Sequence, residues 1–326
     1  MTRPRTLAAA ASLFTILLAG CAVNPRPTFD EASASVKSRT GLETSWMRSE
    51  AEEAIVLARV REILKEPLSP RRAAQIALIN NRGLQARLEE LGIAQANRVA
   101  AGLPSNPEIE GFLGSPSTSS ATNKIDVSFG LNILDLFVLP ARKNLADLEL
   151  RQAKALAGDA ILKVATRAQT EAYELQALEA NAVITGLEVE IEAALTEFAG
   201  ARLKAGTLSQ LEYEEESARL DDLRTRKALL ELEIRKQREA INQTLSLWGD
   251  LTAWTMERLS SDLPAADPSG TEFESVALEQ RFDIAAARAA IELLGGTLKL
   301  HKNTRLLPAG VEVGVRTEKE GGVRLT

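Results

Sequence analysis

The segment KIDVSFGLNI, residues 124–133, alternates strictly between two kinds of side chain. Its apolar positions are Ile125, Val127, Phe129, Leu131 and Ile133, and the positions between them are polar, charged or glycine. A period of two over about ten residues predicts a strand that is apolar on one face only. This length is what a tilted strand needs to cross a bilayer. The alternative is a hairpin that stays in water and packs on helices of its own chain.

A second, weaker strand precedes this segment. Ile109, Gly111 and Leu113 alternate with Glu108 and Glu110, and the polar stretch 114–123 separates the two runs. Two alternating runs joined by a loop rich in Ser, Thr, Gly and Pro predict a β-hairpin. The loop is polar enough to face solvent outside the cell.

Two long helical patterns follow the hairpin. The first runs from about Pro140 to Ala205, and a helix of roughly 65 residues is about 100 Å long at 1.5 Å per residue. Gly206 interrupts it, and a second pattern continues to Leu247. Alternating steps of three and four predict a coiled-coil seam on this second helix, formed by Leu220, Leu223, Lys227, Leu230, Ile234, Gln237 and Ile241. The alternative is an ordinary coiled-coil spacer.

The residues before the hairpin predict a tether and two helices. Residues 22–43 are rich in Pro, Ser, Thr and charge and are expected to be extended. A first helix is expected from Glu43 to Lys65, ended by Pro67. A second is expected from Ser69-Pro70 to about Ala101, since Ser is a good N-cap and Pro suits the first helical position.

An internal repeat links the two halves of the chain. Residues 76–78 (Ile-Ala-Leu) recur at 276–278 as Val-Ala-Leu, and residues 84–86 (Leu-Gln-Ala) recur at 284–286 as Ile-Ala-Ala. A further alternating strand begins near Ala309, and Gly321-Gly322 is expected to start its hairpin partner. The predicted order is therefore helix, hairpin, long helix, long helix, helix, hairpin. The sequence ends at Thr326 before a second pair of long helices, so we expect it to be cut short.

The N-terminus predicts export and lipidation. A short basic region and an apolar run from Leu7 to Ala19 have the lengths of a secretory signal peptide. The run closes with Leu-Ala-Gly-Cys at 18–21, which resembles the lipobox of bacterial lipoproteins and implies an acylated Cys21. Ala22 stands where Asp would favour inner-membrane retention, so the outer membrane is expected. The alternative is an ordinary signal peptide with an incidental cysteine.

Composition excludes several classes of function. The net charge of −6 and pI near 5.3 argue against nucleic-acid binding, which needs a basic face. One histidine and one cysteine leave few possibilities for a metal site or a nucleophilic triad. Neither a phosphate loop nor a nucleophile elbow is present in the sequence. We therefore expect a non-enzymatic protein with no metal and no cofactor other than the lipid on Cys21.

The strands and helices together imply a conduit. Strands in lipid must close into a barrel, because an open edge leaves backbone groups unpaired in hydrocarbon. Ordinary membrane barrels have at least about eight strands, and one copy of this chain offers at most four. The predicted fold is thus mainly α: long antiparallel coiled helices that form part of an α-barrel. Short β-hairpins contribute to an oligomeric transmembrane β-barrel.

The order of elements, the tandem repeat and the turn RLKAGTLS at 202–209 resemble the TolC-type outer membrane efflux factors, lipoprotein branch. The resemblance covers roughly residues 68–326. It implies a homotrimer with a twelve-stranded barrel in the outer membrane and a helical barrel in the periplasm. It also implies a helical tip that contacts a periplasmic adaptor, formed here by Arg202, Ala205, Gly206, Thr207, Leu208 and Ser209. Thr207 departs from the family, where a small apolar residue usually follows the glycine.

The resemblance implies an exit duct for an efflux or secretion pump, fed by an adaptor and an inner-membrane transporter. The expected segments are a signal peptide at 1–20, a lipid-anchored tether and helix at 21–66, and a first repeat at 67–249. A linker at 250–270 and an incomplete second repeat at 271–326 follow. Because the second tip is missing, the chain as given is not expected to close a working trimer. A periplasmic adaptor lipoprotein and a structural envelope lipoprotein are the alternative functions, and the transported substrate stays open.

Overall fold

The computed structural model describes residues 23–106, 108–114, 123–259, 270, 273–305 and 312–321. Its contacts divide the chain into two compact units. Residues up to Asp30, Glu90–Lys154 and Ile284–Thr326 make up unit 1, and Glu31–Glu89 and Ala155–Asp283 make up unit 2. Neither unit is one continuous stretch of sequence. Cys21 lies outside the described residues.

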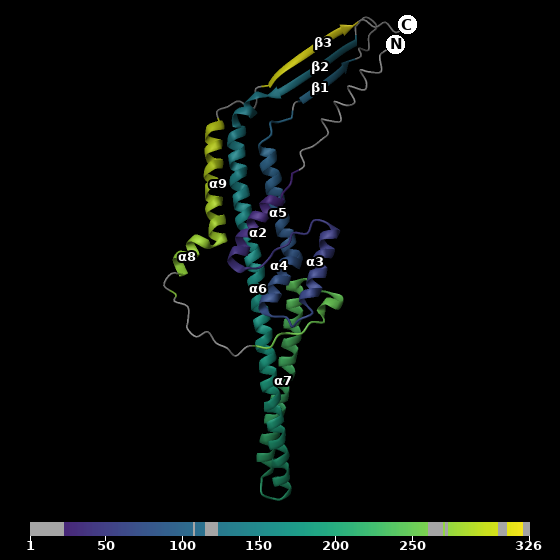
Figure 1. Ribbon diagram of the computed structural model, residues 1–326, viewed down its shortest axis with the longest axis vertical. Coiled ribbons are helices and arrows are strands. Elements are labelled where there is room, and N and C mark those ends of the chain that lie inside the picture. The colour runs from purple at the N-terminus through teal and green to yellow at the C-terminus, as the bar shows by residue number, and fades with distance from the viewer. Residues whose placement is uncertain are drawn as a thin grey trace, which may run out of the picture. The chain divides into compact units, whose positions relative to one another are not determined.

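From α4 to β3 the elements follow the predicted order, and the expected partner strand after Gly321 lies outside the described residues (Figure 1). The helices are α2 (Arg26–Thr40), α3 (Glu50–Ile63), α4 (Pro70–Asn80), α5 (Arg82–Ala101), α6 (Ile133–Lys204), α7 (Gln210–Leu245), α8 (Phe273–Gln280) and α9 (Phe282–Thr304). The strands are β1 (Glu108–Gly114), β2 (Asn123–Asn132) and β3 (Glu312–Gly321), and η1 (Gly249–Thr252) is a short 3-10 helix. The protein is therefore mainly helical. Among the described residues, none of the helices is both long enough and apolar enough to span a membrane.

The expected tether at 22–43 is wrong, because residues 26–40 form α2. Pro27 stands in the first turn, where a missing backbone N–H leaves no helical hydrogen bond broken. Phe29, Ala32 and Val36 follow at helical spacing, and all three are buried. The Ser and Thr content therefore gave a misleading signal, and the apolar spacing decided the structure.

The prediction of one continuous helix over residues 70–101 is also wrong, because the structure has two helices there. Asn81 has an extended backbone with ψ of 117°, so α4 and α5 are separate helices. The Asn81 side chain caps α5 by accepting a hydrogen bond from the Leu84 N–H at 2.7 Å. Ser69 caps α4, with Pro70 in its first turn, as the sequence predicted.

Two further boundaries differ from the expectation. Helix α3 begins at Glu50 rather than Glu43, after the N-cap residue Ser49. Helix α6 begins at Ile133, which was expected as the last residue of the strand, and Pro140 lies inside it. Pro140 is the eighth residue of α6, so its missing N–H leaves the Leu136 carbonyl without its usual helical donor.

The three strands form one antiparallel sheet in the order β1-β2-β3. Strand β1 pairs with β2 in the predicted hairpin, with Ile109 opposite Phe129. Strand β3 pairs with the other edge of β2, with Val315 opposite Phe129. Figure 1 shows the three strands lying side by side. The central strand is therefore the segment with the strongest alternation, and one of its neighbours comes from the second repeat.

The core of unit 2 surrounds the base of the α6–α7 hairpin. It combines residues from α3, α4, α6 and α7 with Leu251, Trp254 and Met256. Leu68 pairs with Met256 in an isolated parallel bridge, and the Leu68 N–H donates to the Thr255 carbonyl at 2.8 Å. The first residues of the expected linker at 250–270 are thus part of this core.

The repeat is visible in the backbone. Helix α4 stops at Asn80 and α5 begins at Arg82, and α8 stops at Gln280 while α9 begins at Phe282. The same break therefore recurs after two hundred residues, and each pair of helices leads to a strand. This confirms the helix and strand order that the sequence similarity predicted.

Candidate functional site: the helical hairpin and the sheet

The tip between α6 and α7 is a Schellman turn centred on Gly206. Gly206 has a φ of +72°, which only glycine adopts without strain. The Thr207 N–H donates to the Arg202 carbonyl at 2.9 Å, and the Gly206 N–H donates to the Leu203 carbonyl at 3.0 Å. These two bonds satisfy the last carbonyls of α6. The sequence-predicted residue Gly206 is confirmed as the point where the chain reverses.

Thr207 adds side-chain bonds to the same turn. Its hydroxyl donates to the Arg202 carbonyl at 3.2 Å, and the Arg202 guanidinium donates to the Thr207 carbonyl at 3.1 Å. A small apolar residue at this position would lose the hydroxyl bond. The departure from the family pattern at Thr207 therefore has a local structural role in this chain.

Ser209 begins α7 with a complete capping box. The Glu212 N–H donates to the Ser209 hydroxyl at 3.2 Å, and the Ser209 N–H donates to the Glu212 carboxylate at 2.8 Å. The hydrogen bond from the Ser209 backbone, followed by the one from its hydroxyl, holds the pKa of Glu212 below its ordinary value. The structure thus brings the six predicted tip residues together at one turn, where all except the half-buried Leu208 are exposed.

We expect Gly206→Ala to lower the stability of the hairpin by about 1 kcal/mol, because an alanine Cβ disfavours a positive φ. Gly186→Ala is the matched control. Gly186 lies within α6, and an added Cβ there would meet no atom within 4 Å. The control should raise stability by about 0.5–1 kcal/mol through helix propensity. Urea unfolding followed by circular dichroism measures both changes, and equal effects of the two variants would contradict the turn geometry.

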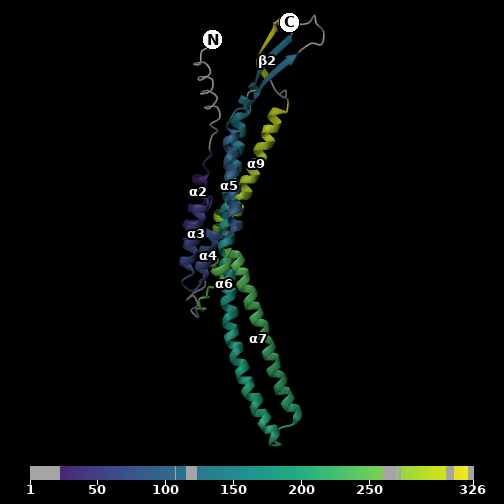
Figure 2. The same ribbon diagram turned by 90° about the vertical axis from the view of Figure 1, so that its right-hand side faces the viewer.

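A continuous seam joins α6 and α7, which run beside each other in both side views (Figures 1 and 2). All seven predicted seam positions of α7 are buried or half-buried. The facing positions of α6 are small or medium in size and none is exposed: Ala182, Gly186, Val189, Ala193, Thr196 and Gly200. The Thr196 hydroxyl lies 3.4 Å from the Glu216 carbonyl across the seam. The seam therefore sets large apolar side chains of α7 against small or medium residues of α6.

Helix α6 carries a second apolar stripe that the seam does not use. Its members are 49–62% exposed and again follow steps of three and four: Ile184, Leu187, Ile191, Leu195 and Phe198. At about 100° per residue, this stripe is centred on the side of α6 opposite the seam. Helix α7 has no such stripe, although Leu211, Leu229 and Leu232 are exposed on its side away from the seam.

The remaining two sides of α6 carry carboxylates over the same residues, although Val183 is exposed on one of them. Glu190 and Glu197 lie on one of these sides, and Glu188 and Glu192 on the other. A surface helix of a globular protein needs one apolar face, whereas this segment has two, on opposite sides. Helix α6 therefore offers a second apolar side to a further neighbour. Sequence inspection found the seam on α7 and missed the outer stripe of α6, although its three-and-four spacing is visible in the sequence.

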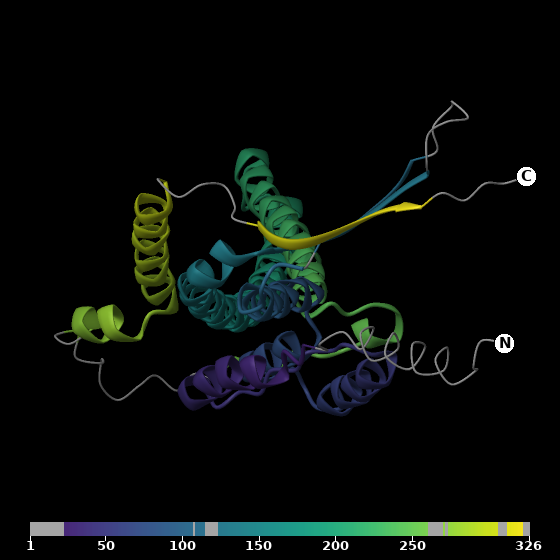
Figure 3. The same cartoon turned by 90° about the horizontal axis from the view of Figure 1, so that it is seen from above.

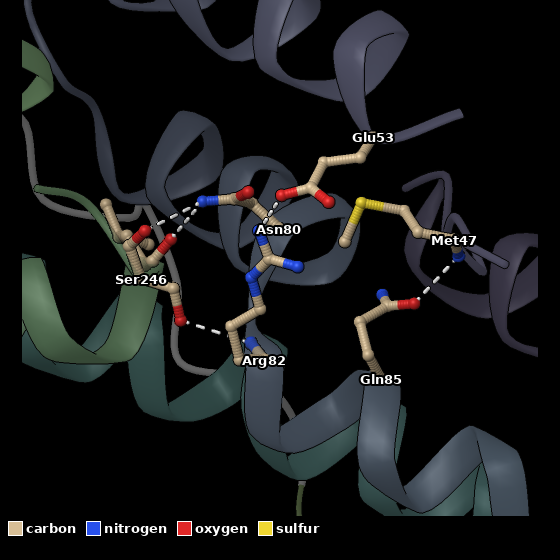
Figure 4. A network of polar contacts seen from close by, with 7 residues as sticks. Met47, Glu53, Asn80, Arg82, Gln85 and Ser246 are labelled. Atoms are coloured by element: carbon tan, nitrogen blue, oxygen red, sulfur yellow. Dashed lines mark hydrogen bonds and ion pairs between the residues drawn. The ribbon is translucent and has the colours of Figure 1, made fainter. Parts of the chain in front are cut away.

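A polar network centred on the buried Asn80 side chain fixes the base of the hairpin (Figure 4). The Asn80 amide donates to the carbonyls of Leu245 and Ser246 at 2.8 and 3.1 Å, which ties the end of α4 to the end of α7. The Arg82 N–H donates to the Ser246 hydroxyl at 3.1 Å, and the Arg82 guanidinium forms an ion pair with Glu53. Beside them, the Met47 N–H donates to Gln85 at 2.8 Å. Sequence reasoning missed this network, because its partners come from distant segments.

Ser246 occupies a left-handed conformation with φ of 52°. Ser246→Ala keeps this strain and removes the acceptor for the Arg82 N–H, so we expect it to cost about 1 kcal/mol. Ser246→Gly also removes the acceptor but relieves the strain, and should be close to neutral. The pair Ser217→Ala and Ser217→Gly inside α7 should show the reverse order, because glycine weakens a helix. Chemical denaturation ranks the four variants, and alanine outperforming glycine at both positions would contradict this assignment.

The break between α8 and α9, in the second repeat, is held by a different set of contacts. The Phe282 ring packs on Gly158 of α6, where an added Cβ would lie 3.0 Å from the ring. The Arg39 guanidinium of α2 covers the same ring at 4.0 Å from its centroid. Helix α2, which was expected to be a tether, therefore helps to position the start of α9.

The sheet-bearing end of unit 1 contains the predicted strand residues. Ile125, Val127, Phe129 and Leu131 lie in β2. Just beyond it, the Asp135 carboxylate accepts from the Ser105 N–H at 3.0 Å and forms an ion pair with Arg142 at 2.8 Å. The bond from Arg142, ahead of that from Ser105, holds the pKa of Asp135 below its ordinary value. These bonds join the chain entering β1 to the helix leaving β2. Figure 3 shows α5 and the start of α6 side by side from above.

Comparison with known proteins gives matches in structure alone. No protein-family model and no curated protein sequence matches the chain. Solved structures do match it: CusC at 16% identity and a TM-score of 0.60, and the Campylobacter jejuni CmeC outer membrane channel at 15% identity and a TM-score of 0.62. The chain has the fold of the outer membrane channels.

The outer membrane protein VceC from Vibrio cholerae matches as well, at 17% identity and a TM-score of 0.56. The matches cover 78%, 77% and 84% of this chain for CusC, CmeC and VceC. The chain spans 66%, 57% and 69% of those three structures in turn. The mainly helical fold with long antiparallel helices, which the resemblance to the TolC-type factors implied, is thereby confirmed. Adaptor contact at the tip, lipidation at Cys21 and the membrane position of β2 stay predictions.

Proposed function

We propose that this chain is a subunit of an oligomeric exit duct in the outer membrane, serving an efflux or secretion pump. The observation that carries the proposal is the long hairpin in which helix α6 has apolar residues on two opposite sides. Helices with apolar faces on opposite sides form walls, because each helix needs a neighbour on both flanks. A wall of such hairpins that closes on itself encloses a channel, and the fold is that of the outer membrane channels.

The sheet supports the same proposal. Within the described residues, β1 and β3 each have one edge without a paired strand. Exposed strand edges favour pairing with further strands, and in lipid such pairing is obligatory. Neighbouring copies of the chain would supply the missing strands, in keeping with a homotrimer and a shared β-barrel.

The expected lipid anchor fits this arrangement. The Thr28 hydroxyl at the start of α2 lies 3.1 Å from the Gln95 side chain of α5, and α5 leads directly to β1. Thr28 is the seventh residue after Cys21, so acylated Cys21 would lie within about 25 Å of that contact. The anchor and the strands would thus meet the membrane at the same end of unit 1.

The tip of the hairpin suits a periplasmic partner. The six tip residues form a rigid, doubly capped turn, and Leu211 beside them is 70% exposed. A periplasmic adaptor connected to an inner-membrane transporter is the partner that we propose for this tip. In this role the protein is a passive, non-enzymatic duct, and its pump selects the substrate.

Two rival functions make different predictions. A periplasmic adaptor would need β-rich domains beside its hairpin, whereas the described residues contain one three-stranded sheet and otherwise helices. A structural envelope lipoprotein would need no conductance. The fold favours the duct over both.

The test compares two proteins produced as lipoproteins. One is the chain itself, and the other carries a second helix pair, a copy of residues 133–249, fused after β3. The fused protein should form trimers in native mass spectrometry and give discrete conductance steps in planar bilayers, while the chain itself should fall short of a trimer. Conductance from the chain alone would overturn the expectation that it needs the second pair. Absence of conductance from a verified trimer would overturn the duct.

A further inference from the structure

Three helices of unit 1 reach the same level next to the sheet. Arg151 of α6 forms an ion pair with Glu292 of α9 at 3.1 Å, and a Cβ added to Gly296 would lie 2.7 Å from Leu145. Helix α9 therefore runs antiparallel to α6. Continuing this register places Lys299 level with Lys143, and Arg305 level with Phe137.

The end of α5 lies at this level too. A Cβ added to Gly102 would lie 3.9 Å from Cδ of Lys143, so the lysine stem passes over the end of α5. The bond between Ser105 and Asp135 brings the next residues to the first turn of α6. The ends of α5, α6 and α9 next to the sheet thus form one collar, which we define by Leu136, Phe137, Lys143, Lys299, Lys302 and Arg305.

The collar has an excess of unpaired positive charge. Three acidic groups on the helices nearby are already engaged: Asp135 with Arg142, Asp147 with Arg98 and Glu292 with Arg151. Among the described residues, Lys143, Lys299, Lys302 and Arg305 have no ion-pair partner, and all four are exposed. This excess occurs in a chain whose net charge is −6, so it does not follow from the composition.

Helix stabilisation accounts for only part of this charge. Cations in the last turn of a helix interact favourably with its dipole, which explains Lys302 near the end of α9. Lys299 lies before that last turn, and Lys143 lies in the third turn of α6, close to its positive end. These two lysines therefore need another explanation.

The collar also exposes apolar side chains. Phe137 is 75% exposed and Leu136 is 47% exposed, directly after strand β2. Phe137 is four residues into α6, so it lies about 6 Å along the helix from the end of the strand. The headgroup layer of a bilayer is about 5–8 Å thick on each side. Aromatic rings favour this layer, and lysine and arginine favour the anionic headgroups beside it.

We propose that this collar binds anionic phospholipid headgroups of the periplasmic leaflet of the outer membrane. The inference rests on the proposed function, since it needs the sheet to lie in the bilayer. Phe137 and Leu136 contact the upper acyl region, while Lys143, Lys299, Lys302 and Arg305 contact the phosphates. The collar fixes the depth of the channel relative to that leaflet.

Native mass spectrometry of the full chain in detergent tests the collar, with equal amounts of phosphatidylglycerol and phosphatidylcholine added as probes. We expect at least about fivefold higher occupancy by phosphatidylglycerol, because each nearby basic residue contributes about fivefold, or 1 kcal/mol. The quadruple variant Lys143→Gln/Lys299→Gln/Lys302→Gln/Arg305→Gln should bind both lipids equally. The matched control Arg219→Gln/Arg224→Gln/Arg226→Gln/Lys227→Gln removes the same charge from α7 and should keep the preference.

The apolar part of the collar has its own variant. Phe137→Ala should lower occupancy by both lipids about tenfold, while Phe198→Ala, which truncates a similarly exposed ring on the hairpin, should lower neither. Equal binding of the two lipids by the unmodified chain overturns the collar, as does a preference that survives the collar variant. If the unmodified chain shows no preference for phosphatidylglycerol while the fused protein conducts, the collar alone is overturned. If the unmodified chain prefers phosphatidylglycerol but the fused trimer gives no conductance, the duct alone is overturned.

Discussion

Trp254→Ala is expected to lower the free energy of unfolding by about 3–5 kcal/mol, the range for truncating a large buried ring. Trp254 is 3% exposed and belongs to the core at the base of the hairpin. Its indole N–H donates to the Asn242 side chain at 2.9 Å, and the Arg238 guanidinium lies 4.1 Å from its ring centroid. The alanine variant leaves both groups without this partner and opens a cavity, so all three losses act in the same direction.

The chain supplies a matched control for this prediction. Trp248 is six residues earlier and 70% exposed, so Trp248→Ala should change stability by less than about 0.5 kcal/mol. Trp254→Phe keeps a large apolar ring but removes the indole N–H. It should lower the free energy of unfolding by about 1–3 kcal/mol, since it leaves the Asn242 oxygen unpaired. Guanidinium unfolding of the chain in detergent, followed by circular dichroism, measures all three. Equal costs at residues 254 and 248 would show that the segment after α7 is not part of the core.

The second large effect concerns the outer stripe of α6. We expect Leu187→Asp/Ile191→Asp to weaken association of the fused protein by about 10²–10⁴-fold. Each lost apolar side chain removes about 1.5–3 kcal/mol of burial, and tenfold in affinity corresponds to about 1.4 kcal/mol. These side chains are 55% and 62% exposed in the single chain. The hairpin itself should therefore keep its helical content and its unfolding midpoint.

The control substitutes residues on a polar side of the same segment. Glu190→Gln/Glu197→Gln changes two exposed residues between the seam and the outer stripe, and should leave the trimer intact. Native mass spectrometry over a range of concentrations gives the association constants. A stripe variant that assembles like the unmodified protein would mean that the outer faces of α6 do not meet other hairpins, and the wall on which the proposed duct depends would be lost.

The features that the sequence predicted correctly depend on residues close together along the chain. The tip needs glycine at 206 for a positive φ and serine at 209 for a cap, and both requirements are met within one turn of helix. The seam on α7 follows from the spacing of its own apolar residues. The β1–β2 hairpin follows from two alternating runs joined by a polar loop. Local chemistry is enough for such elements.

Other features depend on partners that are distant in sequence. Residues 26–40 form a helix because tertiary packing buries Phe29 and Val36, which outweighs the weak helix propensity of the Ser and Thr residues among them. The break at Asn81 is fixed by α7, since the Asn81 amide donates to the Thr244 carbonyl at 2.7 Å. Neither partner can be identified from the local pattern.

The sequence by itself determined the order of elements, the reversal at Gly206 and the alternation of β2, because backbone sterics and side-chain period act over a few residues. Only the tertiary structure decided that β3 pairs with β2, that residues 251–256 enter the core, and that the ends of α5, α6 and α9 bring Phe137 and the basic collar to one level. These outcomes require segments up to about two hundred residues apart to meet. The entropy that the chain loses when these segments meet is offset by the apolar area that the contact buries. That area depends on which distant segments meet, so it cannot be inferred from short stretches of sequence.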